Sequence, residues 1–441
     1  MSDSTGHPRV DQSQPPPLQL HGWADRAVIA VALAALAAGF GQFGLVAALG
    51  DVARDFGQQV HGASIADQVG LSGTELGVGL AIIRLASLGS LPFIGAADRI
   101  GRRTMLLGTL TLGLAMTVAS ALSPGYWWFV VIFACGRPLL SATNALAQVA
   151  AAEQTGTRGR ASAVALTAAG YGVGAGLIAI IDSLASGFLG FRGMFALAVV
   201  PLALVPLLRR WIEEPDRFTV EAAGQDHPLP VLGPVGPRFR RRLAVVALLG
   251  AAIAVITGPA NSFVFLYAQN VLHQPGYVTA AMVVGAGVAG LGGLLVGRWL
   301  ADHLGRRPTG ALAMVGLAGF GTLAYAGSRP ALVTGYIMGV LAGSIIAPPL
   351  GSLLAELFPT SVRASVAGWW VAAGVIGAGV GLVAFGAVAD AGDRFGRAAV
   401  LTFLPTALAA GLFWLVPETR GREPEDLWPS TPTASGPDGS L

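Results

Sequence analysis

The sequence contains no lysine and a single cysteine, Cys135, in 441 residues. Lysine Schiff-base chemistry is therefore excluded, and one cysteine cannot form an intramolecular disulfide. Charged residues make up only 12% of the chain, whereas hydrophobic residues make up 54%. Because a soluble domain cannot bury so large an apolar fraction, the composition indicates a protein that crosses a membrane many times.

Other features that define enzymes are also missing from the sequence. No phosphate-binding loop, metal-ligand cluster or catalytic triad is present, and no acid or histidine falls in the middle third of any predicted span. Residues 1–24 are polar and proline-rich and lack the apolar core of a signal peptide. We therefore expect no enzymatic activity, no cofactor, no metal and no nucleic-acid partner, and the first span should serve as its own insertion signal.

Apolar segments of about 20 residues are long enough to cross a bilayer as helices. We expect twelve such spans, at 26–49, 74–97, 104–123, 126–151, 161–184, 190–212, 243–267, 275–300, 309–327, 330–355, 366–388 and 397–416. The predicted fold class is an all-α membrane protein with twelve transmembrane helices in two pseudo-symmetric six-helix bundles. The expected organisation is an N-terminal tail (1–25), a first bundle (26–212), a linker (213–242), a second bundle (243–416) and a C-terminal tail (417–441).

The arginines are distributed unevenly about these spans. Nineteen of the 27 lie in the tails and in the loops on one side of the membrane, three lie within spans, and five lie on the other side. Because basic residues accumulate in cytoplasmic loops, both termini are predicted to be cytoplasmic. We expect a multi-pass monomer embedded in the lipid bilayer of a bacterial plasma membrane.

Two charged loops recur at an offset of 204 residues, which divides the chain into two similar halves. The loop within Ile94–Arg103 returns within Ala301–Arg307. A glycine between the charged residues permits a tight turn, since glycine enters left-handed backbone conformations freely. A stop-transfer cluster would explain the arginines, but not the recurring acid or the recurring spacing. The residues concerned are Asp98, Arg99, Gly101, Arg102 and Arg103, and then Asp302, Gly305, Arg306 and Arg307.

A second repeat places an acid and an arginine seven residues apart in each half. The pairs are Glu153 with Arg160, and Glu356 with Arg363. Each pair flanks the loop between the fourth and fifth spans of its half. We expect these residues to bridge to the arginines of the charged loops, giving one charged cluster in each half.

Together these motifs resemble those of the major facilitator superfamily, as do Gly190–Arg192 and Pro417–Gly421. The run Ala355–Arg363 is similar to the branch that holds sugar porters, organic-ion transporters and metabolite:proton symporters. The resemblance implies alternating access, in which two bundles rock about a central site. It also implies that the charged loops act as a conformational lock, with Asp98 against the eleventh span. Two-fold symmetry suggests the fifth span as the partner of Asp302.

Two arginines lie deep inside predicted spans and do not repeat between the halves. Arg84 and Arg137 correspond to Val288 and Val340 in the second half. An arginine at the centre of a bilayer costs about 2.5–3.5 kcal/mol, so it indicates a functional site; the alternative is a hydrogen-bonded seam between helices. Because no buried acid accompanies them, an anionic substrate such as a carboxylate would supply the counter-charge. Helical spacing places three further polar residues on one stripe with Arg137, namely Ser141, Asn144 and Gln148.

Paired glycine and proline interruptions in the first and seventh spans, at 39–44 and 257–262, also point to a central site. Helix packing through small residues is the alternative explanation. These segments offer Gln42 and Asn261 as substrate contacts, and we add Tyr171 and Trp369 as aromatic candidates.

Two acids near the ends of spans are the candidates for proton coupling. Asp182 lies on the same helical face as Tyr171, near the outer end of the fifth span, where it is either a proton acceptor or a solvated helix end. Glu75 fits a capping box that begins at Ser72. The leading hypothesis is a secondary active transporter that moves a small organic anion, coupled to protons. The alternatives are an exporter of drugs or metabolites, and a receptor or scaffold without transport.

Overall fold

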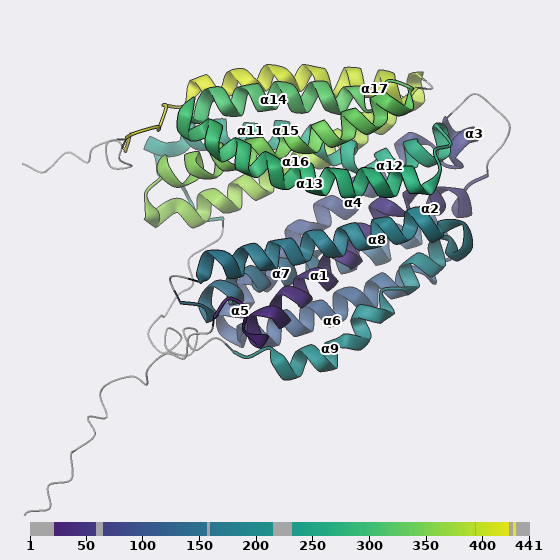
Figure 1. The fold of residues 1–441 in the computed structure, drawn as a ribbon, viewed down its shortest axis with the longest axis horizontal. Helices are drawn as coiled ribbons and strands as arrows, with labels where there is room; N and C mark the ends of the chain where they lie inside the picture. Colours follow the sequence, from purple (N-terminus) through teal and green to yellow (C-terminus); the bar gives the residue numbers. More distant parts are fainter. Residues whose placement is uncertain are drawn as a thin grey trace, which may run out of the picture.

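The computed structural model describes residues 22–58, 65–156, 159–214, 232–392, 394–422 and 427–428. All elements within these ranges are helices, and they form two bundles that lie side by side (Figure 1). Most of the predicted N-terminal tail, linker and C-terminal tail lies outside the described residues.

The helices alternate in direction along each bundle. The N-terminal bundle contains α1 (Arg26–Ala47), α2 (Leu49–Phe56), α3 (Ile65–Val69), α4 (Gly73–Ala86), η1 (Ser87–Gly89), α5 (Ser90–Ile100), α6 (Arg102–Ser120), α7 (Tyr126–Gln154), α8 (Arg160–Ala196) and α9 (Val199–Trp211). The C-terminal bundle contains η2 (Pro237–Phe239), α11 (Arg240–Ser262), α12 (Val264–Leu266), the π-helical turn η3 (Tyr267–Val271), α13 (Gly276–His303), α14 (Arg306–Leu323), α15 (Arg329–Glu356), α16 (Thr360–Gly392), α17 (Phe395–Phe403) and the 3₁₀ segment η4 (Leu404–Leu415).

Eleven helical segments of the described chain are long and apolar enough to cross a membrane. They correspond to eleven of the twelve predicted spans. The remaining span, 309–327, corresponds to α14, whose 18 residues begin with Arg306 and Arg307 and are more polar on average. α14 packs against α15 and η4 in the same way as α6 packs against α7 and α9, so it occupies the position of a span in the second bundle.

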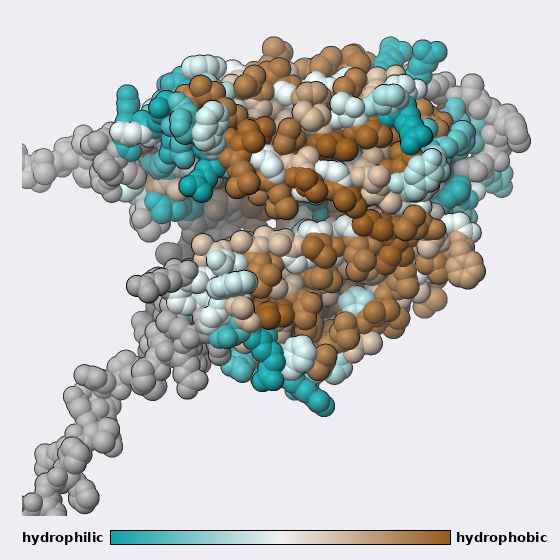
Figure 2. All heavy atoms as spheres, in the orientation of Figure 1, coloured by the Kyte–Doolittle hydropathy of each residue, from teal (hydrophilic) through white to brown (hydrophobic). Residues whose placement is uncertain are grey.

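The two ends of the bundles carry different loops. We call the end with Asp98–Arg103 and Asp302–Arg307 the terminal face, because the described chain begins there (Figure 1). We call the opposite end, with α2 and α3, the distal face. Figure 2 shows apolar side chains over the middle of the molecule and hydrophilic side chains toward both faces, as expected for helices that span a bilayer. In this view the bundles meet near the distal face and part toward the terminal face.

Glycines allow pairs of helices to approach until backbone meets backbone. A Cβ atom added to Gly174 of α8 would lie 1.9 Å from the carbonyl oxygen of Leu36 on α1. The equivalent glycine of the second half, Gly377 on α16, stands 2.3 Å by the same measure from the carbonyl oxygen of Ala251 on α11. Small residues at such contacts are typical of packed membrane helices. They fix α1 against α8 and α11 against α16, the pairs that contribute to the central cavity.

The structure changes several predicted helix boundaries. Residues 39–44 and 257–262, which we expected to be interrupted, are helical; α1 continues to Ala47, and α11 ends at Ser262, the last residue of the second segment. Pro259 is accommodated inside α11. The expected loop between the fifth and sixth spans is also helical, and the break falls at Gly190, whose φ of 58° and ψ of 178° are non-helical. Glycine tolerates that conformation because it lacks a Cβ atom.

The close contact of α8 with α1 makes Gly174 intolerant of a side chain. We expect Gly174→Ala to lower the free energy of unfolding by about 1–3 kcal/mol, because the added methyl group overlaps a backbone carbonyl. Gly172→Ala is the matched control on the same helix, since nothing lies within 4 Å of its added Cβ. Both variants gain the same helix propensity. The difference between their melting temperatures in detergent therefore measures the cost of the overlap between the added methyl group and the carbonyl oxygen of Leu36. Equal melting temperatures would show that the helices separate without cost.

Candidate functional site

A cavity of about 540 Å³ lies between the two bundles. Its wall is formed by α1, α4, α7 and α8 from the first bundle and by α11, α13, α14, α15 and α16 from the second. Most of the lining is apolar. Five of the predicted substrate-binding residues belong to the wall, namely Gln42, Arg84, Arg137, Tyr171 and Asn261.

Arg137 is held at the cavity wall by contacts with α1. Its Nη1 atom donates to the backbone oxygen of Gln42 at 3.3 Å, while its Nε atom is buried without a hydrogen-bond partner. The hydroxyl of Tyr171 on α8 donates to Oε1 of Gln42 at 3.3 Å. This arrangement depends on Gly39, because a Cβ atom there would lie 2.1 Å from the carbonyl oxygen of Tyr171. The close approach of α1 and α8 therefore builds one side of the site.

Arg84 adds a second positive charge to the same wall. It lies on α4, eleven residues after the helix begins at Gly73, and its charge interacts with that of Arg137. The residues that line the cavity include no aspartate, glutamate or histidine. The two guanidinium groups therefore give the cavity a net positive charge that its own wall does not compensate.

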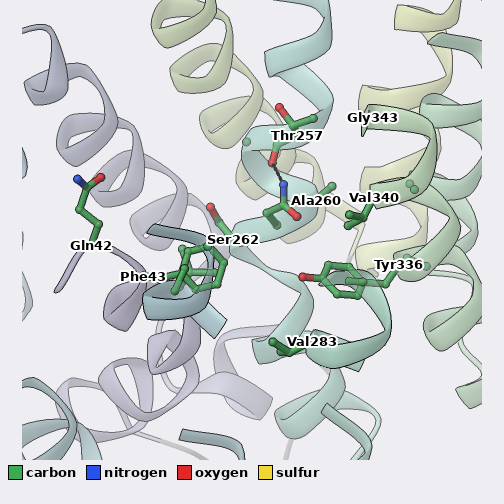
Figure 3. A pocket seen from close by; sticks show the side chains of 18 of the residues that line it. Gln42, Phe43, Thr257, Ala260, Ser262, Val283, Tyr336, Val340 and Gly343 are labelled. Carbon is green, nitrogen blue, oxygen red and sulfur yellow. Dashed lines mark hydrogen bonds between the residues drawn. The ribbon is translucent and has the colours of Figure 1, made fainter. Parts of the chain in front are cut away.

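The wall contributed by the second bundle carries uncharged polar groups. Nδ2 of Asn261 donates to the backbone oxygen of Thr257 at 2.9 Å, which leaves its amide oxygen as an acceptor. Ser262 and Tyr336 also line the cavity, and Figure 3 shows the Tyr336 hydroxyl pointing toward the side where Phe43 and Ser262 lie. We did not select Tyr336 from the sequence. Its hydroxyl group does not repeat between the halves, because Phe133 stands at the equivalent position of the first half, and this difference was the signal in the sequence.

Four predicted substrate-binding residues are not part of the cavity wall: Ser141, Asn144, Gln148 and Trp369. The stripe on α7 continues toward the terminal face, away from the cavity, because each helical residue advances about 1.5 Å. Trp369 lies elsewhere in this conformation: its Nε1 atom donates to the backbone oxygen of Gly233 at 3.3 Å, and the residue is 43% exposed. Sequence spacing identifies a helical face but does not show where along that face the cavity ends.

The two proton-coupling candidates have different environments. Asp182 is only 1% exposed, which contradicts the reading of a solvated helix end. It lies at the distal face, where it contacts Gln269 of the second bundle, and its Oδ1 atom is buried without a partner. Glu75 forms the capping box predicted from the sequence: Ser72 accepts from the Glu75 backbone N–H at 3.1 Å, and the Glu75 carboxylate accepts from the Ser72 N–H at 3.2 Å. The Glu75 carboxylate is thereby engaged in capping the first turn of α4.

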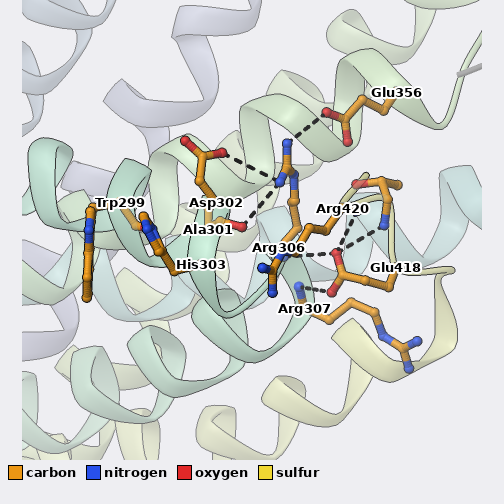
Figure 4. A network of polar contacts seen from close by, with 10 residues as sticks. Trp299, Ala301, Asp302, His303, Arg306, Arg307, Glu356, Glu418 and Arg420 are labelled. Atoms are coloured by element: carbon orange, nitrogen blue, oxygen red, sulfur yellow. Dashed lines mark hydrogen bonds and ion pairs between the residues drawn. The ribbon is translucent and has the colours of Figure 1, made fainter. Parts of the chain in front are cut away.

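The charged loops of the terminal face form one cluster in each bundle. Arg102 pairs with Glu153 at 3.2 Å and also with Asp98. In the second bundle Arg306 pairs with Glu356 at 3.3 Å and with Asp302 at 3.6 Å (Figure 4). The turns need glycine, since φ is 110° at Gly101 and 108° at Gly305. These contacts are made within each bundle.

Each cluster contains a third acid that sequence reasoning missed. Glu214 accepts from the backbone N–H groups of Arg102 and Arg103 at 2.5 and 3.0 Å. Glu418 does the same for Arg306 and Arg307 at 2.9 and 3.0 Å (Figure 4). These carboxylates cap the first turns of α6 and α14, where backbone N–H groups lack helical partners. Their offset of 204 residues matches that of the charged loops and was the signal that could have revealed them.

The remaining predicted lock residues have simpler contacts. Arg363 donates to the backbone oxygen atoms of Ala355 and Phe358 at 2.9 and 3.4 Å. Arg99 and Arg160 are exposed. Asp98 and Asp302 are 42% and 55% exposed and lie beside their own arginines. Their predicted contacts with helices of the opposite bundle are not made in this conformation.

Comparisons with known proteins agree with this architecture. The model of the Major Facilitator Superfamily matches residues 31–321, and the model described as "Sugar (and other) transporter" matches residues 233–428. The chain is 20% identical to the xylose transporter of E. coli in its inward-open conformation, with a TM-score of 0.69 and coverage of 91% of this chain and 99% of that chain. At that identity the likeness concerns the fold.

Three curated relatives, each 25% identical, carry transport names. A putative metabolite transport protein of Haemophilus influenzae aligns over 76% of this chain and 85% of its own length. A probable 4-methylmuconolactone transporter of Cupriavidus pinatubonensis aligns over 81% and 85%, respectively. The cis,cis-muconate transport protein of Acinetobacter baylyi aligns over 75% and 82%.

The contacts of Glu418 predict that the stability of the protein depends on pH. Partial burial opposes ionisation of this carboxyl group, but hydrogen bonds from four backbone N–H groups outweigh burial and hold the pKa of Glu418 below its ordinary value. The ionised form therefore stabilises the fold above the ordinary glutamate pKa of about 4.3, and this stabilisation is lost as pH falls through the lower folded-state pKa.

We expect Glu418→Gln to destabilise the protein by about 0.5–2 kcal/mol at neutral pH, as loss of a helix cap does. The difference from the wild type should shrink in acid. Asp302→Asn is the control, because an exposed ion pair contributes little. Melting temperatures measured from neutral pH to pH 3 test this, and a Glu418→Gln deficit that stays constant over that range would refute the assignment.

Proposed function

Because this chain belongs to the major facilitator superfamily, a family of membrane transporters rather than enzymes, we propose that it is a secondary active transporter of small organic acids. The observation that carries this proposal is the uncompensated pair of arginines in the central cavity. Arg84 and Arg137 line a space of about 540 Å³ whose wall contains no acid.

A carboxylate is the natural counter-ion for such a site. A guanidinium group offers parallel N–H donors that match the two oxygens of a carboxylate, and the unpartnered Nε of Arg137 is one of these donors. In an apolar surrounding an unpaired charge is costly, so binding an anion removes a cost that the empty cavity bears. Asn261 and Tyr336 on the opposite wall offer hydrogen-bonding groups to the far end of the molecule.

The names of the relatives support an organic acid as the substrate. One relative is named for cis,cis-muconate, a dicarboxylate, and two others are named for 3-(3-hydroxyphenyl)propionate and gentisate, both aromatic acids. The mostly apolar lining, with Phe43 and Tyr336 on opposite walls, suits the carbon skeleton of such compounds. A sugar would leave both guanidinium groups without a counter-charge.

We propose that the terminal face is cytoplasmic in a bacterial plasma membrane, with both chain ends on that side. The supporting observation is that nineteen of the 27 arginines lie in its loops and tails. The bundles, which we delimit at 26–212 and 243–416, then alternate between openings to the two sides. In this scheme the conformation described here faces inward, and the lock residues Asp98 and Asp302 act in the opposite conformation.

Asp182 is our candidate for proton coupling. Its carboxyl group is buried where the bundles meet at the distal face, and Gln269 and Arg54 are the polar groups around it. Arg54 is already paired with Asp51, so it compensates Asp182 only in part. Closing the distal face removes this carboxyl group from water, and a carboxylate without full compensation is costly there. A proton taken up by Asp182 would therefore accompany closure.

Arg137 should anchor the substrate carboxylate. We expect Arg137→Ala to weaken binding roughly tenfold to more than a hundredfold, since hydrogen bonds to charged groups contribute about 1.5–3 kcal/mol. Arg137→Lys should also weaken binding, because it keeps the charge but loses the planar fork. Titration calorimetry with cis,cis-muconate, gentisate and 3-(3-hydroxyphenyl)propionate measures the affinities, with xylose as the neutral control.

Melting temperatures of the same variants separate binding from packing. If Arg137 only joins helices, Arg137→Ala should melt earlier while its affinity for the acid is unchanged. A well-folded Arg137→Ala protein that binds its acid normally would contradict the anchoring role. Failure of the wild type to bind any acid in the panel would contradict the substrate class.

The proposed coupling predicts that Asp182→Asn separates substrate movement from the proton gradient. In vesicles, wild-type uptake should rise when the outside is made acidic, because closure of the distal face takes up a proton. The variant should still exchange substrate between the two sides but should not accumulate it. Glu75→Gln is the control, as its carboxylate caps α4. Accumulation by Asp182→Asn that follows the pH gradient like the wild type would exclude this residue.

A further inference from the structure

A carboxylate of the second bundle caps a helix of the first bundle at the distal face. Asp390, near the end of α16, accepts from the backbone N–H of Gly73 at 2.6 Å through Oδ1. Its Oδ2 atom accepts from the backbone N–H of Thr74 at 2.8 Å and from the Thr74 hydroxyl at 2.5 Å. Gly73 and Thr74 are the first two residues of α4. These three hydrogen bonds link residues more than 300 positions apart in the sequence.

The position of Asp390 makes this contact a strong one. The first N–H groups of a helix have no helical partners, and the helix dipole favours a negative charge at that end. The capping box of Ser72 and Glu75 satisfies other groups of the same turn. Asp390 therefore adds a cap from the opposite bundle to a helix end that is already ordered. Glycine brings the helices together here: a Cβ atom on Gly386 would lie 2.1 Å from the carbonyl oxygen of Gly73.

The second crossing of the bundles at the distal face lacks such an acid. There α13 meets α8, and a Cβ atom on Gly276 would lie 1.5 Å from the carbonyl oxygen of Ser183. The hydroxyl of Thr279 donates to that of Ser183 at 2.9 Å. The residue equivalent to Asp390 in the first half is Gly187, at an offset of 203. The glycine contact is thus repeated in both halves, whereas the charged cap occurs at one crossing.

We propose that Asp390 is a latch residue that stabilises the conformation closed at the distal face. This inference rests on alternating access, which is part of the proposed function, but not on the identity of the substrate. When the bundles separate at the distal face, Asp390 leaves the first turn of α4, and its three hydrogen bonds pass to water. The bonds are present only in the closed state, so they bias the equilibrium toward it.

Asp390 and Asp98 lie at opposite ends of the contact between α16 and the segment formed by α4 and α5. Their locations suggest how these helices stabilise both the distally closed and the distally open state. Asp390 lies two residues before the end of α16 at Gly392, and Asp98 lies two residues before the end of α5 at Ile100. Asp390 caps the first turn of α4, which begins the segment that α5 ends. Asp98 is exposed and paired with Arg102 in this conformation. In this conformation Asp390 therefore contacts α4 at the distal face, while Asp98, the predicted lock residue of the terminal face, does not contact α16.

Electron paramagnetic resonance distances between spin labels test the latch directly. In a Cys135→Ser background, labels at Leu122 and Ala326 report the separation of the bundles at the distal face, where both positions are exposed and lie on different bundles. We expect Asp390→Ala to raise the ratio of distally open to distally closed molecules roughly 2- to 30-fold, as expected for loss of a helix cap. Thr74→Val, which removes one of the three donors, should shift the ratio less, in the same direction.

Asp55→Asn is the matched control. Asp55 is also an acid of the distal face, but its partner, Arg192 at 3.6 Å, belongs to the same bundle. It should leave the distances unchanged. Melting temperatures establish that each variant is folded, and Asp390→Asn, which keeps one oxygen acceptor, carries the test if Asp390→Ala does not fold. A folded Asp390 variant with the wild-type distance distribution overturns the proposal.

The readout requires no substrate, so it is separable from the proposed transport of organic acids. A shift in the distance distribution together with failure to bind any acid would support the latch and reject the substrate class. Normal binding of an acid without a shift in the distance distribution would support the substrate class and reject the latch. A wild-type protein with a single distal distance that no Asp390 variant changes would reject the latch.

Discussion

A charge placed within a membrane protein must be paired, hydrogen-bonded or hydrated, and most of this structure satisfies that requirement locally. At the terminal face Arg102 and Arg306 pair with acids of their own bundles, while Glu214 and Glu418 cap the helices that follow. The central cavity differs, because Arg84 and Arg137 share a wall without acids. Two positive charges therefore face this cavity without a compensating acid in its wall.

Repetition separates the groups that build the molecule from the groups that act in it. The glycine turns, the paired acids and the caps of α6 and α14 occur in both halves, as expected of a scaffold made from two similar bundles. Arg84, Arg137, Tyr336 and Asp390 have no counterparts of the same type in the other half. In the function we propose, the two similar bundles rock about the cavity, and these unrepeated residues make its site and its gate asymmetric.

The two faces of the molecule are held in different ways in this conformation. At the terminal face the ionic contacts lie within each bundle, so they do not oppose separation of the bundles. At the distal face the contacts cross between bundles, through backbone atoms at glycine positions and through the carboxylate of Asp390. Asp182 is buried in the same region. A change that opens the distal face must therefore expose two carboxyl groups and a set of helix N–H donors together.

The sequence alone determined the number of halves, most of the spans and the class of protein, because apolar length and recurring motifs are local properties of the chain. It also identified Arg84, Arg137, Gln42, Tyr171 and Asn261, since charge and polarity in apolar segments are visible without coordinates. It did not determine where helical faces end in space, so Trp369 and the stripe that follows Arg137 were assigned to a cavity they do not line. The burial of Asp182 and the cap formed by Asp390 were decided by tertiary structure, because both depend on how tightly the two bundles close at the distal face. That closeness arises from backbone contacts between residues more than 90 positions apart, which no local pattern records.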